Sequence, residues 1–157
     1  RRYTMEKEYE INEETMAIVS IDDTHSEVYE LDHHYIVAQS TNQIMDESCR
    51  YFGSSLEGRR KGTEAMIGIN YKAPVIVEES KEIIFFPTSS ARFNADWIGL
   101  KHVRSYYRDG DILFLEFHNG QKIPLRVSYG VLDNQILRAT RLESTLRGRK
   151  SAKKTVK

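Results

Sequence analysis

The sequence has only one cysteine, Cys49, and three prolines among its 157 residues, and it has no long hydrophobic run. A single thiol cannot close an intrachain disulfide, which excludes a disulfide-stapled secreted scaffold and favours a reducing compartment. No apolar stretch approaches the roughly 18–20 residues of a membrane-spanning helix, and the first residues lack the apolar core of a signal peptide. We therefore expect a cytoplasmic protein without a membrane contact.

Catalytic and cofactor-binding patterns are also missing. The sequence has no Gly-x-Ser-x-Gly elbow, no phosphate-binding P-loop and no dinucleotide-binding glycine fingerprint. Cys49 falls on the apolar stripe of a predicted helix, where a buried and inert thiol is expected. His33 and His34 are adjacent, without a second cluster at metal-ligand spacing, and we expect them in a surface loop. The sequence thus predicts no enzyme, no cofactor and no metal site.

What the sequence does contain is aromatic side chains and an uneven distribution of charge. Nine tyrosines, six phenylalanines and one tryptophan can fill one hydrophobic core in a chain of this length. The formal net charge is zero, but residues 1–47 carry twelve acidic side chains against three basic ones, and residues 136–157 carry eight basic ones against Glu143. This asymmetry predicts an acidic end and a basic end that face different partners, with a merely solvated basic tail as the alternative.

Short segments of strand character alternate with polar breaks. Residues 1–7 are expected to be an untethered N-terminal tail, and strands are expected at 8–11, 16–21, 28–31, 35–38, 74–77, 82–86, 97–100 and 103–107. A hairpin is predicted over residues 112–128. A three-residue loop at 118–120 with a left-handed Gly120 buries one consistent face, because it pairs Leu115 with Ile123 and Leu113 with Leu125.

A helical insertion is predicted at about residues 41–66. Ser40, Thr41 or Asn42 can cap its start, and Gly53 is expected to end its first helix in the left-handed conformation. The apolar stripe of that helix lies at helical spacing and consists of Met45, Cys49, Phe52 and Leu56.

A second helix is predicted to start at a capping box of Ser54 and Glu57 and to run to about Met66. Gly58 and Gly62 lie on one face of it, and each costs about 1 kcal/mol relative to alanine. Either that face must let another element or a ligand approach closely, or the segment is a loop with one helical turn. A last helix is predicted at residues 134–147.

These patterns together predict an α+β fold. We expect a single, mainly antiparallel β domain with the helical insertion at about 41–66 and a C-terminal helix. The expected organisation is an N-terminal tail at 1–7, one folded domain at 8–147 and a basic C-terminal tail at 148–157.

Residues 48–63 combine glycines, hydroxyls and four basic side chains with one acid. Backbone amides near glycine, hydroxyl groups and cationic side chains are the groups that bind phosphate oxygens, and arginine enters narrow A/T-rich minor grooves. A solvated basic helix is the alternative interpretation. The candidate DNA-binding residues are Arg50, Ser54, Ser55, Arg59, Arg60, Lys61 and Thr63.

The same stretch carries a resemblance to a known family. The block Cys-Arg-Tyr-Phe-Gly-Ser-Ser-x-x-Gly-Arg-Arg-x-Gly-Thr at residues 49–63 resembles the signature of the competence transcription factor (ComK) family. Shorter matches follow in the same order, and the resemblance covers about residues 8–142. These matches are Lys72-Ala-Pro-Val, Phe85-Phe-Pro-Thr, Trp97-Ile, Asn119-Gly, Ser128-Tyr129 and Asn134-Gln135.

The resemblance implies an activator of DNA-uptake genes that binds paired A/T-rich boxes in double-stranded DNA, largely through the minor groove, as a homodimer or a higher assembly. Longer members continue into a C-terminal segment linked to activation and to capture by a protease adaptor. This chain ends in a basic sequence instead. We therefore expect either that it binds DNA without full activation or that it escapes the turnover that follows capture by the adaptor. The alternative function is a protein-interaction module that modulates a full-length homologue.

Overall fold

The computed structural model describes residues 4–91 and 94–155. One group of strands comprises β1 (Thr4–Glu6), β2 (Thr15–Asp22), β3 (His25–Glu30), β4 (His34–Val37), β5 (Val75–Glu78), β6 (Ile83–Pro87) and β7 (Trp97–Gly99). A second group comprises β8 (Val103–Asp109), β9 (Ile112–Phe117) and β10 (Lys122–Leu125). The helices are α1 (Thr41–Tyr51), α2 (Leu56–Ile67) and α3 (Tyr129–Thr155), with a 3₁₀ turn at Leu100–His102.

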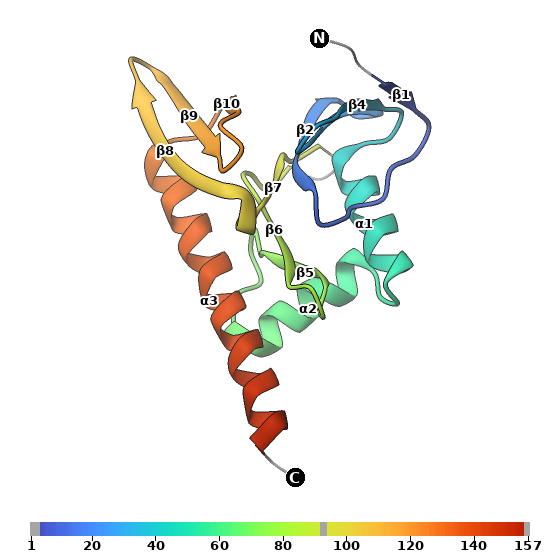
Figure 1. Cartoon of the computed structure of the whole chain (residues 1–157), viewed down its shortest axis with the longest axis vertical. Helices are drawn as coiled ribbons and strands as arrows, with labels where there is room; N and C mark the ends of the chain where they lie inside the picture. The colour runs from blue at the N-terminus through green and yellow to red at the C-terminus, as the bar shows by residue number, and fades with distance from the viewer. Residues whose placement is uncertain (1–3, 92–93, 156–157) are drawn as a thin grey trace.

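The strands form two sheets, as Figure 1 shows. The larger sheet has the order β1-β4-β3-β2-β7-β6-β5, and the smaller one has the order β10-β9-β8. Neighbouring strands are antiparallel except β1 and β4, which run parallel. The predicted fold class, a mainly antiparallel α+β single domain with a helical insertion and a C-terminal helix, is confirmed.

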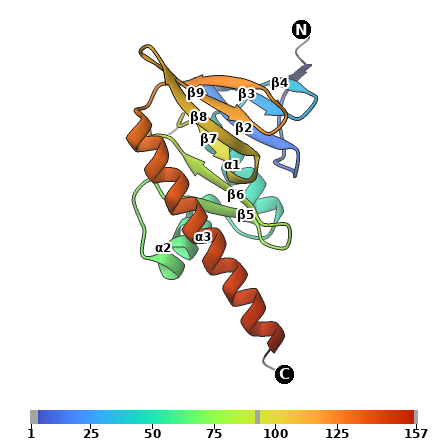
Figure 2. The same ribbon diagram turned by 60° about the vertical axis from the view of Figure 1, so that its left-hand side comes forward.

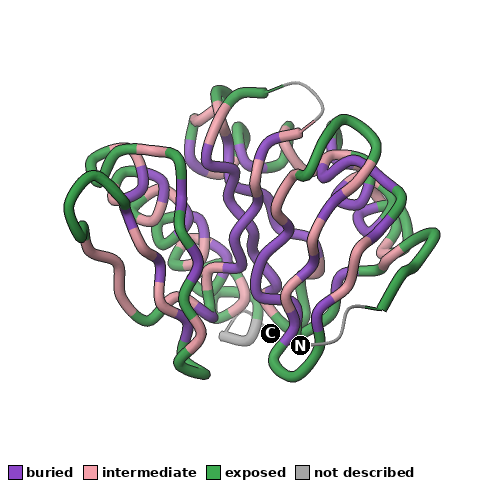
Figure 3. Tube along the Cα trace, turned by 90° about the horizontal axis from the view of Figure 1, so that it is seen from above, coloured by how far each residue is buried: buried purple, intermediate pink, exposed green. Residues whose placement is uncertain are grey.

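The strands β5, β6 and β7 of the larger sheet are buried on both faces. Side chains alternate along β6, so Ile84 and Phe86 belong to one apolar cluster while Phe85 belongs to the other. The first cluster includes residues of the smaller sheet and of α3, such as Leu115 and Leu142, and the second includes residues of α1 and α2. In Figure 3 the buried positions accordingly concentrate along the central strands, with exposed positions in the loops around them.

The N-terminal part differs from the prediction. Residues 4–6 are not untethered, because they form β1 and pair with residues 35–37 of β4. Residues 8–11 form no strand, although Ile11 is buried and its amide donates to Ser48 Oγ at 3.0 Å. Both errors come from nonlocal contacts that local periodicity does not report.

The expected surface loop at His33 and His34 is wrong for His34. This residue starts β4, is buried, and stacks on Tyr29 with ring centroids 4.4 Å apart. Its Nε2 lies 3.0 Å from Glu27 Oε2. His34 therefore belongs to the packed sheet.

The helical insertion consists of two helices. Ser40 caps α1, since its side chain accepts from the amide of Gln43, and Gly53 takes the left-handed conformation with φ +92°. The predicted capping box of Ser54 and Glu57 is wrong, because it is Ser55 Oγ that accepts from the amide of Gly58. The loop alternative is also wrong, since α2 is a continuous helix ended by left-handed Gly68.

The β9–β10 hairpin has the predicted register. Leu115 pairs with Ile123, Leu113 pairs with Leu125, and Gly120 has φ +90°. The last helix was predicted too short: α3 spans Tyr129–Thr155, and residues 148–155 continue it instead of forming a loose tail. Figure 2 shows its C-terminal part extending past the sheets.

Candidate nucleic-acid interface

A groove of about 420 Å³ runs between α2 and α3. We call it the α2–α3 groove. Its lining combines apolar side chains, among them Met66, Ile76 and Leu146, with hydroxyl and charged residues. The complete lining is Ser54, Gly58, Arg59, Gly62, Thr63, Ala65, Met66, Ile76, Glu79, Leu146, Arg149, Lys150 and Lys153.

Cations from two distant parts of the chain meet in this groove. Arg59 comes from α2, and Arg149, Lys150 and Lys153 come from α3. Arg149 and Lys153 are exposed and have no hydrogen-bond or ion-pair partner among the described residues. Glu79 is the one carboxylate in the described lining. The α2–α3 groove is therefore an electropositive surface with two cations available to an anionic ligand.

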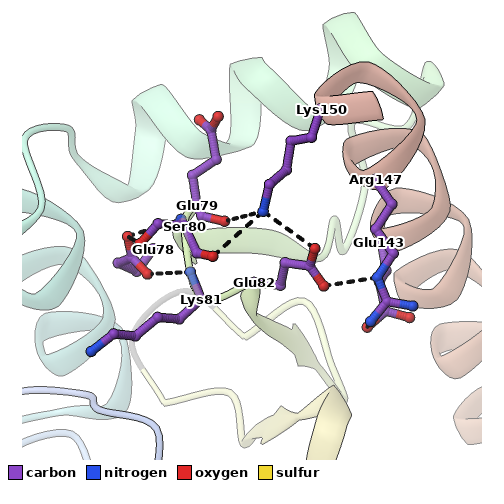
Figure 4. Close-up of polar contacts among 8 residues, drawn as sticks. All are labelled: Glu78, Glu79, Ser80, Lys81, Glu82, Glu143, Arg147 and Lys150. Atoms are coloured by element: carbon purple, nitrogen blue, oxygen red, sulfur yellow. Dashed lines mark hydrogen bonds and ion pairs between the residues drawn. The ribbon is translucent and has the colours of Figure 1, made fainter. Parts of the chain in front are cut away.

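The turn between β5 and β6 holds other α3 cations, as Figure 4 shows. Lys150 Nζ lies 3.3 Å from Glu82 Oε2, and it donates to the carbonyls of Glu79 and Ser80 at 3.5 and 3.4 Å. Arg147 Nε donates to Glu82 Oε1 at 2.8 Å. The hydrogen bond from Arg147 lowers the pKa of Glu82 below its usual value. These contacts fix the position of α3 beside the groove.

The predicted residues Arg59 and Thr63 lie towards the interior. Arg59 Nη2 makes long hydrogen bonds of 3.5 Å to the carbonyls of Phe52 and Val77, so it is only partly available at the groove. Thr63 is buried, and its hydroxyl donates to the carbonyl of Pro74 at 2.6 Å. Thr63 is thus committed to joining α2 to the start of β5.

Arg50, Ser54 and Ser55 surround the corner between α1 and α2. Arg50 Nε donates to Asp46 Oδ2 at 2.8 Å, and this hydrogen bond raises the pKa of Arg50. Asp46 also accepts from the amide of Leu56, so Arg50 belongs to the ion pair that organises the corner. Ser55 caps α2, and only Ser54 of these three residues lines the α2–α3 groove.

Arg60 and Lys61 lie away from the α2–α3 groove. Arg60 lines a second groove of about 400 Å³, which we call the α2–β7 groove because it lies between α2 and the segment leading into β7. Lys61 is exposed, and neither residue has a hydrogen bond or ion pair within residues 4–91 and 94–155. The predicted basic cluster is therefore divided between two faces of α2.

The glycine strip of α2 faces the α2–α3 groove. A side chain at Gly62 would meet nothing within 4 Å, so the backbone is bare there. A Cβ at Gly58 would lie 2.7 Å from Ser54 Oγ. Helix α3 lies across the groove from this strip, but no α3 atom is among the close neighbours of either glycine, so packing against α3 does not explain the two glycines on one helix face.

The only cysteine is buried in α1. Burial raises the pKa of Cys49 to about 11, so the thiol stays protonated at neutral pH. The described residues contain no group of three or more histidine, cysteine or carboxylate side chains placed to hold a metal ion. No helix in the described part of the chain has the length and apolarity that a membrane crossing requires.

The cations of α3 were not among the predicted site residues. Their charge was visible in the sequence as the excess of basic residues over 136–157. Their position beside α2 could not be predicted, because the predicted helix ended at residue 147, two residues before Arg149.

Comparison with known proteins gives the family to which this chain belongs. The model of the family described as ComK protein matches residues 6–151, and the chain belongs to that family. The family is one of transcription factors, which is not an enzyme class.

The chain is 36% identical over 146 residues to the Competence transcription factor of Bacillus subtilis (strain 168). That alignment covers 90% of this chain and 76% of the relative. The resemblance seen in residues 49–63 is thereby confirmed. No solved structure matches the chain.

Proposed function

We propose that this protein regulates the transcription of competence genes by binding A/T-rich double-stranded DNA. Membership of the ComK family and the similarity to a competence transcription factor support this role. It acts in the cytoplasm, at the nucleoid, as a homodimer or a higher assembly. A full-length homologue and a protease adaptor are its further candidate partners.

The observation that carries the proposal is the convergence of cations in the α2–α3 groove. Arg149 and Lys153 of α3 lie beside Gly62 of α2, where the backbone is bare, and neither cation has a partner in the described part of the chain. Lysine and arginine supply most of the affinity for DNA because they neutralise phosphates and release bound counterions. In this proposal α3 and the glycine strip lie against one sugar–phosphate edge of the duplex.

A preference for A/T-rich sequence follows if an arginine side chain enters the minor groove. A narrow A/T-rich minor groove has a deepened negative potential that attracts guanidinium groups. Arg149 is exposed and lines the α2–α3 groove, so its guanidinium group can reach such a minor groove. Among the predicted residues, Ser54, Arg60 and Lys61 remain available at the surface, and Arg59 contributes charge from its partly buried position.

The test compares an A/T-rich duplex with a G/C-rich duplex, using the whole protein and titrations from about 50 to about 200 mM salt. We expect tighter binding to the A/T-rich duplex. The double variant Arg149→Ala/Lys153→Ala should weaken binding, and the slope of log affinity against log salt should fall by about 0.9 for each phosphate that the variant no longer neutralises.

The matched control is Arg104→Ala/Arg108→Ala, which removes two exposed cations from β8 in the smaller sheet. It changes the net charge by the same amount, so any effect of total charge appears in both double variants. Equal affinities and slopes for the two variants would remove the α2–α3 groove from the interface. Failure of the wild-type protein to bind either duplex would contradict the proposed function itself and favour the protein-interaction module.

A further inference from the structure

Tyr71 is an exposed aromatic residue at a sharp corner of the chain. Its side chain belongs to the segment between α2 and β5, and the residue is 61% exposed. Lys72 Nζ lies 5.8 Å from the centre of the tyrosine ring. A large aromatic ring beside a cation, facing solvent, contributes nothing to the core, and it offers a flat apolar surface to a ligand.

This corner is held in place from behind by α3. Arg138 Nη1 donates to the carbonyl of Tyr71 at 3.0 Å, and Gln135 Nε2 donates to the carbonyl of Lys72 at 2.9 Å. Gln135 is buried and donates to the carbonyl of Pro87 as well, which connects the corner to β6. The exposed ring therefore projects from a braced turn.

Lys72 also has a strained backbone. Its φ of +49° is in the left-handed region, which costs a non-glycine residue of order 1 kcal/mol and persists only where surrounding contacts impose it. Those contacts are the two hydrogen bonds from α3. Such strain is frequent at binding sites, where a side chain must be presented in one direction.

The groove beside the corner has the chemistry of a phosphate site. The α2–β7 groove is lined by Tyr71 together with two cations, Arg60 and Lys72, and two hydroxyl residues, Ser89 and Ser90. Glu57 is the only carboxylate residue in its described lining. Cations and hydroxyls bind phosphate oxygens, and an aromatic face binds a nucleobase, so the site contains the complements of both parts of a nucleotide.

We infer that the α2–β7 groove is a second DNA-contact site in which Tyr71 stacks on a nucleobase while Arg60 and Lys72 hold the adjoining phosphate. This inference rests on the proposed DNA-binding function and adds a base contact to it. The base becomes accessible at pyrimidine–purine steps such as TA, which unstack readily in A/T-rich duplexes.

The experiment uses an A/T-rich duplex that carries the fluorescent base 2-aminopurine at TA steps, because its fluorescence rises when the base is no longer stacked on its neighbours. The variants of the whole protein are Tyr71→Ala, Tyr71→Phe and the control Ile112→Ala, which trims another exposed apolar residue at the start of β9. We expect wild type, Tyr71→Phe and the control to raise the fluorescence. Tyr71→Ala should abolish the rise and weaken binding about tenfold, the effect of removing one stacked base.

The outcomes separate this inference from the proposed function. If Tyr71→Ala binds as tightly as wild type and produces the same fluorescence rise, Tyr71 does not stack on DNA, and the α2–α3 groove keeps its proposed role. If all four proteins bind without any rise in fluorescence, the stacking inference is likewise wrong and the α2–α3 groove keeps its proposed role. If wild type binds no duplex, both the proposed function and this inference are wrong.

Discussion

At the scale of single residues, two neighbouring arginines of α2 have different environments. A helix turns by about 100° per residue, so Arg59 and Arg60 point to different sides. Arg59 faces the α2–α3 groove and bonds to the carbonyls of Phe52 and Val77, whereas Arg60 lines the α2–β7 groove without such a bond. One therefore supports the fold, and the other is available to a ligand.

The first residue-scale prediction compares Arg59→Ala with Arg60→Ala. Arg59→Ala should lower the free energy of unfolding by about 1–2 kcal/mol, because two carbonyls lose a donor and the packed aliphatic part of the side chain is removed. Arg60→Ala should change it by less than about 0.5 kcal/mol, as for other surface positions, and should weaken duplex binding. Urea unfolding and duplex titration measure the two effects. Equal losses of stability would contradict these separate roles.

The composition of residues 48–63 predicted a cationic site, but it could not tell which side chains face solvent. Thr63 and Arg50 have residue types that bind phosphate, yet Thr63 donates to the carbonyl of Pro74 and Arg50 pairs with Asp46. Those partners depend on where β5 packs against α2 and on the angle between α1 and α2. Neither the packing of β5 nor this angle can be predicted from the spacing of residue types along the sequence.

At the scale of elements, the position of α3 depends on the turn between β5 and β6. Glu82 lies 65 residues before Arg147, and it binds both Arg147 and Lys150 (Figure 4). The helix was predicted to end at residue 147, whereas the structure continues it to Thr155. A basic helix end without an apolar stripe gives no periodic signal, so this part of α3 could not be predicted from the sequence.

The contacts of Glu82 predict a pH-dependent contribution to stability. The hydrogen bond from Arg147 lowers the pKa of Glu82 in the folded protein below its usual value near 4.5. A carboxyl group with a lowered folded pKa stabilises the fold above the unfolded value, and this stabilisation is lost as the pH falls through the folded value. Glu82→Gln should therefore cost about 1 kcal/mol at neutral pH, the upper range for exposed ion pairs, and nothing once the wild-type carboxyl is protonated.

Urea unfolding of wild type and Glu82→Gln at neutral pH and at about pH 3 measures this difference. Glu10→Gln is the matched control, because Glu10 is exposed and its carboxylate has no partner in the described part of the chain. A loss of stability for Glu82→Gln that is the same at both pH values would show that the ion pairs are not its cause.

At the scale of the whole molecule, charge is separated along the long axis. β1 and β4 of the acidic N-terminal region lie towards one end of the molecule and the basic end of α3 lies at the other, while α1, which carries Asp46 and Glu47, lies between them (Figure 1). The sequence predicted this asymmetry, and the fold places the two ends apart. A polyanion is then attracted to the α3 end and repelled from the β1 end, which orients the protein as it approaches DNA.

The long helix α3 also connects the two sheets. Tyr106 of β8 donates to Asp133 Oδ1 at 2.5 Å, and this hydrogen bond raises the pKa of Tyr106 to about 12. On the larger sheet, Gln135 donates to the carbonyl of Pro87 in β6. The local hairpin of β9 and β10 was predictable from turn chemistry, but the pairing of β1 with β4 and these contacts of α3 were not, because they join residues far apart in the sequence.

Gln135 is the buried connection whose removal should affect the whole molecule. It is 1% exposed, and its Nε2 donates to the carbonyls of Lys72 at 2.9 Å and Pro87 at 2.7 Å. Gln135→Ala leaves two carbonyls without this donor and opens a cavity beneath α3, so it should lower the free energy of unfolding by about 2–3 kcal/mol. Urea unfolding checks this value against Asn134→Ala, the exposed neighbouring amide. A Gln135 variant as stable as the Asn134 variant would show that α3 is held without this contact.

The same variant, if it remains folded, should also reduce the rise in 2-aminopurine fluorescence on duplex binding. The corner at Tyr71 and Lys72 then keeps only one of its two hydrogen bonds from α3, the one from Arg138 to the carbonyl of Tyr71.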